Sequence, residues 1–317
     1  MKATEDKNLG GHLAIFSAQI IFGVNMIIGK KALAWDAVSP DALTLYRMVG
    51  TMLLMWFASL FFPRERVARR DLLLLLLASL FGMTINQTIF IRGLSLTSPV
   101  NASMIATISP IITMALAALY LREPITWKKA TGVFLAVIGA LILILGGDRA
   151  DNLDGNLRGD LLCLLSCTSF AVYLTFFRDV VRRYSFITVM KWMFTFAALC
   201  TLPFGHRYLS LEVWNAMNTE ALLEVGYVVV LSTFVAYLLV SIGQQTLRPT
   251  VVSIYSNIQP LVASIATVAL GMGAFGWRKA GAAALIFAGV YITTISRSRA
   301  QMEQARKTSA PTPPSEA

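Results

Sequence analysis

Apolar residues occur in runs of about twenty along most of the chain, and short polar or charged stretches separate these runs. Twenty helical residues at about 1.5 Å each cross a hydrocarbon core of about 30 Å. The runs lack the strict alternation of barrel strands, so helices are the structure that can satisfy the backbone in lipid. The pattern predicts an all-α membrane protein with ten transmembrane helices, over residues 12–31, 42–62, 71–93, 98–121, 130–147, 160–178, 185–205, 220–243, 249–272 and 279–296.

The chain also contains an internal duplication. A shift of 150 positions, without a gap, places residues of the first half on identical residues of the second half. The matched pairs include Gly93 and Gly243, Pro99 and Pro249, Pro110 and Pro260, Trp127 and Trp277, Lys129 and Lys279, and Gly139 and Gly289. A register held over this length indicates two copies of one structural unit.

The duplication and the spans together predict the domain organisation. The first repeat is expected over residues 12–147 and the second over residues 160–296, with an extracytoplasmic linker at 148–159. Each copy has five spans, an odd number, so the second copy must cross the membrane in the opposite sense to the first. Two inverted five-helix repeats around a central cavity are typical of secondary transporters. Residues 1–11 are expected to precede the first span, and the polar residues 297–317 to form a disordered cytoplasmic tail.

Composition and charge agree with a membrane location. The chain of 317 residues is 56% hydrophobic and 14% charged, whereas a soluble domain carries roughly a quarter charged residues. Its net charge of +10 lies mostly in short loops, where positive residues set membrane orientation and do not indicate a nucleic-acid partner. With the N-terminus inside, the cytoplasmic side receives 17 Lys and Arg residues and the other side 8. This bias predicts a multi-pass protein of the cell (inner) membrane with both termini cytoplasmic.

The segment 121–132, Leu-Arg-Glu-Pro-Ile-Thr-Trp-Lys-Lys-Ala-Thr-Gly, follows the Pro110 span, and it resembles the EamA family of the drug/metabolite transporter superfamily. Arg47, near the start of the second span, adds to the resemblance, which covers both halves. The resemblance implies ten helices around a central cavity and export of amino acids or related small metabolites. One departure is that Glu123 of the first half corresponds to Gly273 of the second, which puts a symmetrical role for this carboxylate in doubt.

Two prolines and a polar stripe indicate where the cavity lies. Pro110 and Pro260 fall near the middle of the fourth and ninth spans, where each removes a helix hydrogen bond and should act as a hinge. Polar residues precede both prolines at helical spacing, and polar groups at this depth need a partner or water. These residues are Ser103 and Thr107 in the first copy and Ser253 and Asn257 in the second. Hydrogen bonds from the hydroxyls to their own backbone are the alternative explanation.

Further polar and aromatic residues occupy the first, third, sixth and eighth spans. An amide within the bilayer is costly unless it bonds across helices or faces water, so either interhelical bonding or cavity lining explains it. The residues expected to line the cavity are Gln19 and Asn25, Asn86 and Gln87, Ser169 and Tyr173, and Tyr237. Together they predict a cavity of amide, hydroxyl and aromatic groups that holds a small-molecule substrate.

Arg47 and Lys191 are the basic residues that lie clearly within the predicted spans. Each lies about 10 Å from the start of its helix at 1.5 Å per residue, and the two helices enter from opposite faces. Both could attract an anionic or carboxylate-bearing substrate. Both could equally extend to the lipid headgroups at that depth.

Other functions have less support in the sequence. The two histidines, His12 and His206, lie at the ends of spans, and no zinc motif or paired carboxylate occurs, so no catalytic residue, metal or cofactor is predicted. The hypothesis is therefore a transporter that exports small metabolites by alternating access. A membrane-embedded enzyme or a receptor is the alternative. Gly132 and Gly139, mirrored by Ala282 and Gly289, predict one face of close helix packing, and either a monomer or a homodimer is compatible with it.

Overall fold

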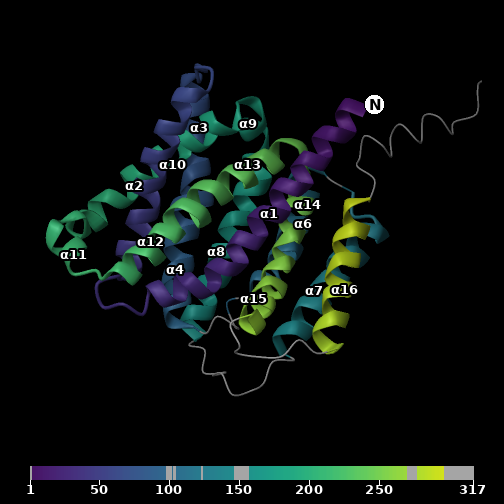
Figure 1. Cartoon of the computed structure of the whole chain (residues 1–317). Helices are drawn as coiled ribbons and strands as arrows, with labels where there is room; N and C mark the ends of the chain where they lie inside the picture. The colour runs from purple at the N-terminus through teal and green to yellow at the C-terminus, as the bar shows by residue number, and fades with distance from the viewer. Residues whose placement is uncertain are drawn as a thin grey trace, which may run out of the picture.

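The computed structural model describes residues 2–97, 102, 105–122, 124–145, 157–269 and 277–295, and every regular element in these ranges is a helix. The α-helices, in chain order, are α1 (Lys2–Ala32), α2 (Pro40–Ala58), α3 (Arg69–Ser79), α4 (Asn86–Leu96), α6 (Ser109–Tyr120), α7 (Trp127–Leu145), α8 (Leu157–Phe176), α9 (Arg178–Arg183), α10 (Phe186–Gly205), α11 (Leu211–Asn215), α12 (Thr219–Val229), α13 (Ala236–Thr246), α14 (Pro249–Ile254), α15 (Ile258–Ala269) and α16 (Trp277–Thr294). Figure 1 shows their arrangement.

Six helical stretches among the described residues are long and apolar enough to cross a membrane. They are Leu9–Ala32, Pro40–Phe61, Arg69–Leu96, Leu157–Phe176, Phe186–Leu209 and Thr219–Thr246, and Ser109–Tyr120 and Ala280–Thr293 are apolar but shorter. The all-helical, multi-span class is therefore confirmed, while ten spans and the inverted arrangement of the repeats stay predictions. The predicted segment 1–11 is continuous with α1, and α8 includes the last residues of the predicted linker. The rest of that linker and the predicted tail lie outside the described residues.

The duplication extends to the fine structure of the helices. A π-helical turn, Leu80–Ile85, interrupts the stretch from α3 to α4, and another, Val230–Val235, interrupts the stretch from α12 to α13. All six elements correspond at a shift of 150 residues, from Arg69 on Thr219 to Leu96 on Thr246. A π-turn adds one residue to the helical path and is often found at functional sites. Both halves thus widen the same helix at the same point.

Helix ends are built from local capping groups. Ser39 caps α2 because its hydroxyl accepts a hydrogen bond from the Ala42 amide at 3.2 Å, and Pro40 occupies the first turn. Asn218 caps α12 in the same way, accepting from the Ala221 amide at 2.8 Å. These caps satisfy amides that no earlier helical carbonyl can reach.

Helices of the two halves pack against each other in pairs that exchange under the repeat. α1 packs against α13 and α15, and correspondingly α8 packs against α4 and α6. α2 packs against α10. The two copies are therefore interleaved, and the interior is shared between them.

The predicted small-residue face packs α7 against α16, side by side at one edge of the molecule (Figure 1). A Cβ atom on Gly132 would lie 2.8 Å from the Gly289 carbonyl oxygen, and one on Gly139 would lie 2.8 Å from the Ala282 carbonyl oxygen. Such contacts are too short for any side chain, so the glycines allow the backbones to approach. This face is consequently occupied within one chain.

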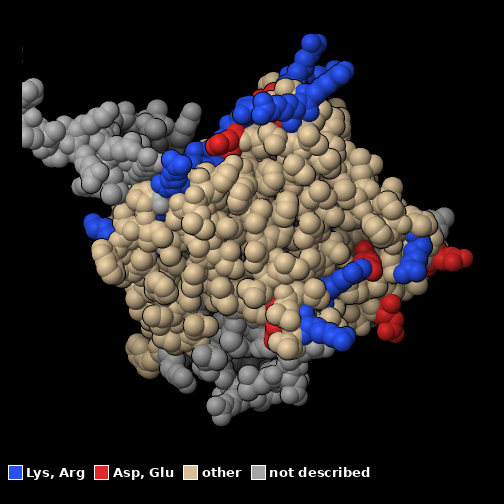
Figure 2. All heavy atoms as spheres, turned by 180° about the vertical axis from the view of Figure 1, so that it is seen from behind, with Lys and Arg blue, Asp and Glu red and all other residues tan. Residues whose placement is uncertain are grey.

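Charged residues tie the helix ends together. Asp71, at the start of α3, accepts hydrogen bonds from Arg183 at 2.7 Å and from the Tyr184 hydroxyl at 2.6 Å. Partial burial raises the pKa of Glu65, but hydrogen bonds from the Ser185 amide and hydroxyl outweigh this and hold that pKa below its usual value. On the face in Figure 2, Lys, Arg, Asp and Glu gather toward the ends and leave a broad belt without charge between them. That distribution suits a chain whose middle lies in lipid.

Candidate functional site

A cavity of about 120 Å³ lies between the two halves, large enough for several water molecules. Helices α1, α2, α4, α6, α8, α13, α14 and α15 contribute to its wall, as do Ala106 before α6 and the 3-10 turn Tyr255–Asn257 before α15. Its lining residues are Gln19, Phe22, Asn25, Met26, Arg47, Asn86, Gln87, Phe90, Ala106, Ser109, Ser166, Cys167, Phe170, Tyr237, Val252, Ser253, Ser256 and Gln259. The wall is therefore mostly amide, hydroxyl and aromatic.

A hydrogen-bond network of α4 with α8 and α13 forms one wall of the cavity. The Asn86 amide nitrogen donates to the carbonyl and hydroxyl oxygens of Ser166, both at 2.9 Å. The Gln87 amide nitrogen donates to Asn86 Oδ1 at 2.7 Å and to the Tyr237 hydroxyl oxygen. The Tyr237 oxygen is thus an acceptor for Gln87, so the hydroxyl hydrogen remains available to another acceptor.

Arg47 is the cationic residue of the lining. Only 3% of it is exposed, and its Nε donates to the Thr233 hydroxyl oxygen at 2.8 Å. Thr233 lies in the π-turn and donates in turn to the Val228 carbonyl five residues earlier, at 2.7 Å. The wide turn therefore orients Thr233, which orients the guanidinium. Among the residues that the structure describes, no Asp or Glu lines the cavity, so the terminal nitrogens of Arg47 have no carboxylate partner there.

Three further polar groups of the lining have no hydrogen-bond partner within the described residues. They are Asn25 Oδ1, Gln87 Oε1 and the Ser253 hydroxyl, all buried. A buried amide oxygen without a partner costs about 1–3 kcal/mol, which a bound donor would recover. The cavity thus offers acceptors from Asn25 and Gln87 together with donors from Arg47 and Tyr237.

Helix interruptions accompany both predicted hinges. Pro110 stands in the first turn of α6 after a turn at residues 107–108, and Pro260 stands in the first turn of α15 after a 3-10 turn, Tyr255–Asn257. A first-turn proline needs no amide hydrogen, so it suits a restarted helix. The residues before the prolines, Ser109 and Gln259, both line the cavity. The interruptions therefore occur at the cavity wall.

The structure brings many of the predicted residues together. Gln19, Asn25, Arg47, Asn86, Gln87, Tyr237 and Ser253 all line the cavity. Gln19 also accepts a hydrogen bond from Gln259 at 2.5 Å, which joins α1 to α15.

Other predicted residues lie away from the lining. Ser169 donates to the Phe81 carbonyl oxygen in the first π-turn at 2.7 Å, and Tyr173 donates to Gln244 at 2.8 Å. Thr107 and Asn257 are buried but do not line the cavity. The Lys191 ammonium lies 4.7 Å from the centre of the Trp56 ring, outside the cavity. Ser103 lies outside the described residues.

Some lining residues were missing from the sequence-based set. Ser109 and Gln259 correspond at the shift of 150 and each precede a hinge proline, so the repeat could have identified them. Ser166 lies one turn before predicted Ser169 on α8, and Cys167 is next to it, so helical spacing offers a weaker indication of these two residues. Among the described residues, no group of three His, Cys, Asp or Glu side chains could hold a metal ion.

Comparison with known proteins adds a family and a fold. Residues 9–145 and 157–295 each match the model of the EamA-like transporter family. The chain is 27% identical over 275 residues to an S-adenosylmethionine/S-adenosylhomocysteine transporter of Chlamydia muridarum, covering 83% of this chain and 82% of the relative. It is 22% identical over 284 residues to the uncharacterized transporter YyaM of Bacillus subtilis, covering 84% and 87% of the two chains. A crystal structure with 19% identity matches 90% of this chain and 97% of its own with a TM-score of 0.71, which supports the fold alone.

Proposed function

Because the chain belongs to the EamA-like transporter family, we propose that it exports amino acids or related amphipathic metabolites by alternating access. The observation that carries the proposal is the buried guanidinium of Arg47 in a cavity wall without a carboxylate. A buried charge without a partner is costly, and a substrate anion would neutralise it. This is the kind of group that a carrier recognises and releases.

The carboxylate and ammonium groups of an amino acid match the hydrogen-bond donors and acceptors of the cavity. A carboxylate can accept hydrogen bonds from the terminal nitrogens of Arg47 and from the Tyr237 hydroxyl. An ammonium group can donate to Asn25 Oδ1 and Gln87 Oε1, the acceptors without protein partners. Phe22, Phe90 and Phe170 supply apolar surface for the rest of the molecule. S-adenosylmethionine, named for one relative, carries the same head group attached to a heterocycle.

Alternation is supported by the architecture of the two halves. Paired helix contacts exchange under the repeat, and both halves have a break before a proline at the cavity wall. We propose that Pro110 and Pro260 are hinges about which each half opens the cavity to one side of the membrane. The charge bias supports cytoplasmic termini. The described lining residues include no His, Lys, Asp or Glu, which favours transport over the alternative of a membrane enzyme.

A transport screen tests the proposal. The purified full-length protein is reconstituted into proteoliposomes loaded with a mixture of radiolabelled amino acids and adenosyl amino acids, and efflux is measured. We expect efflux of at least one carboxylate-bearing compound above that of protein-free vesicles. Efflux of none of them, by a protein shown to be folded and inserted, would contradict the proposal.

Cys167 offers a native reporter, because its side chain lines the cavity. We expect a small anionic methanethiosulfonate reagent to modify Cys167 in proteoliposomes, and a saturating transported substrate to slow this modification severalfold. Peptide mapping by mass spectrometry measures the rate at each cysteine. Cys163 is the matched control, because it is only 1% exposed and packs against Gly93. A rate at Cys167 that transported substrate leaves unchanged would place the substrate elsewhere.

A further inference from the structure

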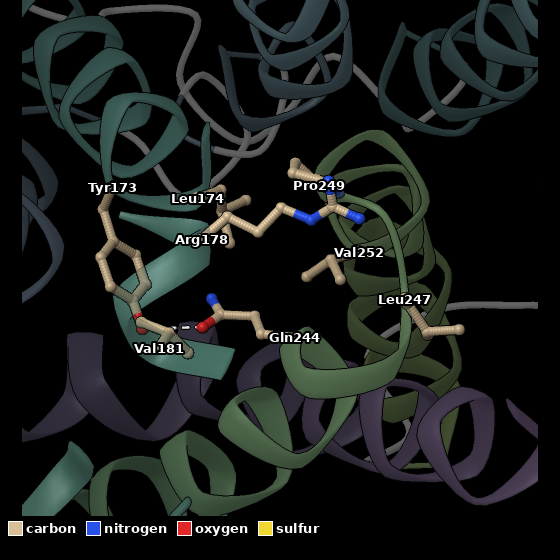
Figure 3. A pocket seen from close by; sticks show the side chains of 8 residues that line it. All are labelled: Tyr173, Leu174, Arg178, Val181, Gln244, Leu247, Pro249 and Val252. Carbon is tan, nitrogen blue, oxygen red and sulfur yellow. Dashed lines mark hydrogen bonds between the residues drawn. The ribbon is translucent and has the colours of Figure 1, made fainter. Parts of the chain in front are cut away.

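A second, smaller pocket lies beside the junction of α13 and α14, opposite the end of α8 and α9 (Figure 3). Its volume is about 10 Å³, roughly that of one water molecule. Val252 lines both this pocket and the central cavity. Gly11, near the start of α1, lies against Thr246 and Leu247. The pocket therefore adjoins the cavity at the end of the molecule near the N-terminus.

Two hydrogen-bond donors of this pocket have no acceptor. The Tyr173 hydroxyl donates to Gln244 Oε1 at 2.8 Å, which directs the amide nitrogen of Gln244 away from Tyr173 and toward the pocket (Figure 3). That nitrogen is buried and has no partner in the described residues, and Gln244 is only 6% exposed. Arg178 reaches across the same pocket, and its Nε is also buried without a partner.

The surroundings favour a negative ligand. Besides Arg178 and Gln244 the pocket is lined by apolar residues and Tyr173, and the lining includes no carboxylate. Nearby Arg182 is already engaged, because its Nε donates to the Gln245 carbonyl oxygen at 2.8 Å. The guanidinium of Arg178 and the amide nitrogen of Gln244 both donate hydrogen bonds, and the pocket beside them has room for about one atom. These features suit a single negatively charged acceptor atom.

The repeat explains why this feature occurs at one end only. At the shift of 148 residues that matches Phe22 with Phe170, the counterpart of Arg178 is Lys30. The Lys30 ammonium donates to the carbonyl oxygens of Leu94 at 2.8 Å and Thr97 at 3.3 Å, at the end of α4. Arg178 makes no hydrogen bond to any described residue at the matching end of α13. One cation of the pair is thus satisfied by backbone, and the other is available to a ligand.

We propose that Arg178 and Gln244 form an anion-binding site next to the central cavity, on the side of the molecule where the N-terminus lies. Its ligand is a small anion, either the carboxylate group of the transported molecule or an inorganic anion. A carboxylate of the transported molecule as the ligand rests on the proposed function. The site would then bind the substrate transiently on its way past Val252 to the cavity. An inorganic anion as the ligand does not depend on transport.

Thermal unfolding of the purified full-length protein tests the site. Sodium acetate or sodium chloride replaces sodium methanesulfonate stepwise at constant ionic strength. Acetate represents the carboxylate of a transported molecule, and chloride represents an inorganic anion. We expect a saturable rise of Tm in the wild type. Arg178→Met and Gln244→Leu should each weaken the apparent affinity about tenfold or more, because each removes a donor to an anion. Lys30→Met, the repeat counterpart, should retain the whole rise. Arg47→Met removes the carboxylate contact proposed for the central cavity, and should retain the part of the rise that Arg178→Met and Gln244→Leu weaken.

The outcomes separate the possibilities. A response to acetate that persists in Arg47→Met supports the carboxylate of a transported molecule as the ligand, and a response to chloride alone supports an inorganic anion. The absence of a saturable rise in the wild type would overturn the proposal. So would a rise that Arg47→Met abolishes while Arg178→Met and Gln244→Leu keep it. If Arg178→Met does not fold, Gln244→Leu decides by itself. A normal anion response in a protein that fails the transport screen would refute the proposed function and leave this site standing.

Discussion

Replacement of Arg47 by methionine is expected to lower transport of a carboxylate-bearing substrate at least tenfold. The expectation follows from burial, because Arg47 is 3% exposed and lines a cavity where no other described residue is charged. A hydrogen bond to a charged group contributes about 1.5–3 kcal/mol, and about 1.4 kcal/mol corresponds to tenfold in affinity. Methionine fills a similar volume, so the helix packing should survive. Initial transport rates in proteoliposomes over a range of substrate concentrations measure the effect.

Two matched variants make this result interpretable. Lys191→Met removes a cation from the partner helix α10, but Lys191 lies over Trp56 and outside the cavity, so a much smaller loss is expected. Arg47→Lys keeps the charge but loses the bond from Nε to Thr233, and should show intermediate transport. Equal losses in Arg47→Met and Lys191→Met would mean that membrane charge, not recognition in the cavity, accounts for the effect.

Replacement of Gly289 by leucine is expected to prevent stable folding. A Cβ atom at this position would lie 2.5 Å from the Gly132 carbonyl oxygen and 2.6 Å from the Ala136 backbone nitrogen. Backbone atoms cannot move aside as the end of a flexible side chain can, so α7 and α16 must separate. Overpacking in a tight interior costs about 3 kcal/mol, and the separation adds lost contacts along both helices. The monodisperse fraction after detergent extraction and its Tm measure the outcome.

Gly281 is the control on the same helix, because a Cβ atom there meets nothing within 4 Å. Gly281→Leu should therefore yield protein with a Tm close to that of the wild type. Similar yields and Tm values for the two leucine variants would show that the contact of α7 with α16 is dispensable.

Much of the site could be predicted because the chain repeats itself. The polar residues of α1 and α4 lie in long apolar runs. An amide side chain there needs a hydrogen-bond partner or water, and this requirement predicted that these residues line one cavity. Pro110 and Pro260 indicated that the fourth and ninth spans form walls of this cavity, because a proline removes a backbone hydrogen bond in any helix. The repeat would also have added Ser109 and Gln259, had it been applied to the residues beside the prolines.

Other features could not be read from the pattern. Arg47 and Lys191 occupy similar depths in their helices, yet one faces the cavity and the other a tryptophan ring, because different helices pack against them. Thr233 stands in an apolar run like any other threonine, and its role depends on the π-turn that sets its direction. Tyr173 lies on the expected helix, but its side chain is long enough to place the hydroxyl at the smaller pocket, beside Gln244. Helical spacing identifies a face but not the depth that a side chain reaches.

The π-turns carry information about the history of the chain. π-turns are rare within α-helices, so two of them at the same point of two copies are improbable by chance. The turns Leu80–Ile85 and Val230–Val235 nevertheless coincide at the shift that relates the two copies. We infer that the π-turn was already present when the two copies arose. Thr233 and Met83 differ at this shared position, so the hydroxyl that Arg47 contacts belongs to the turn of the second copy.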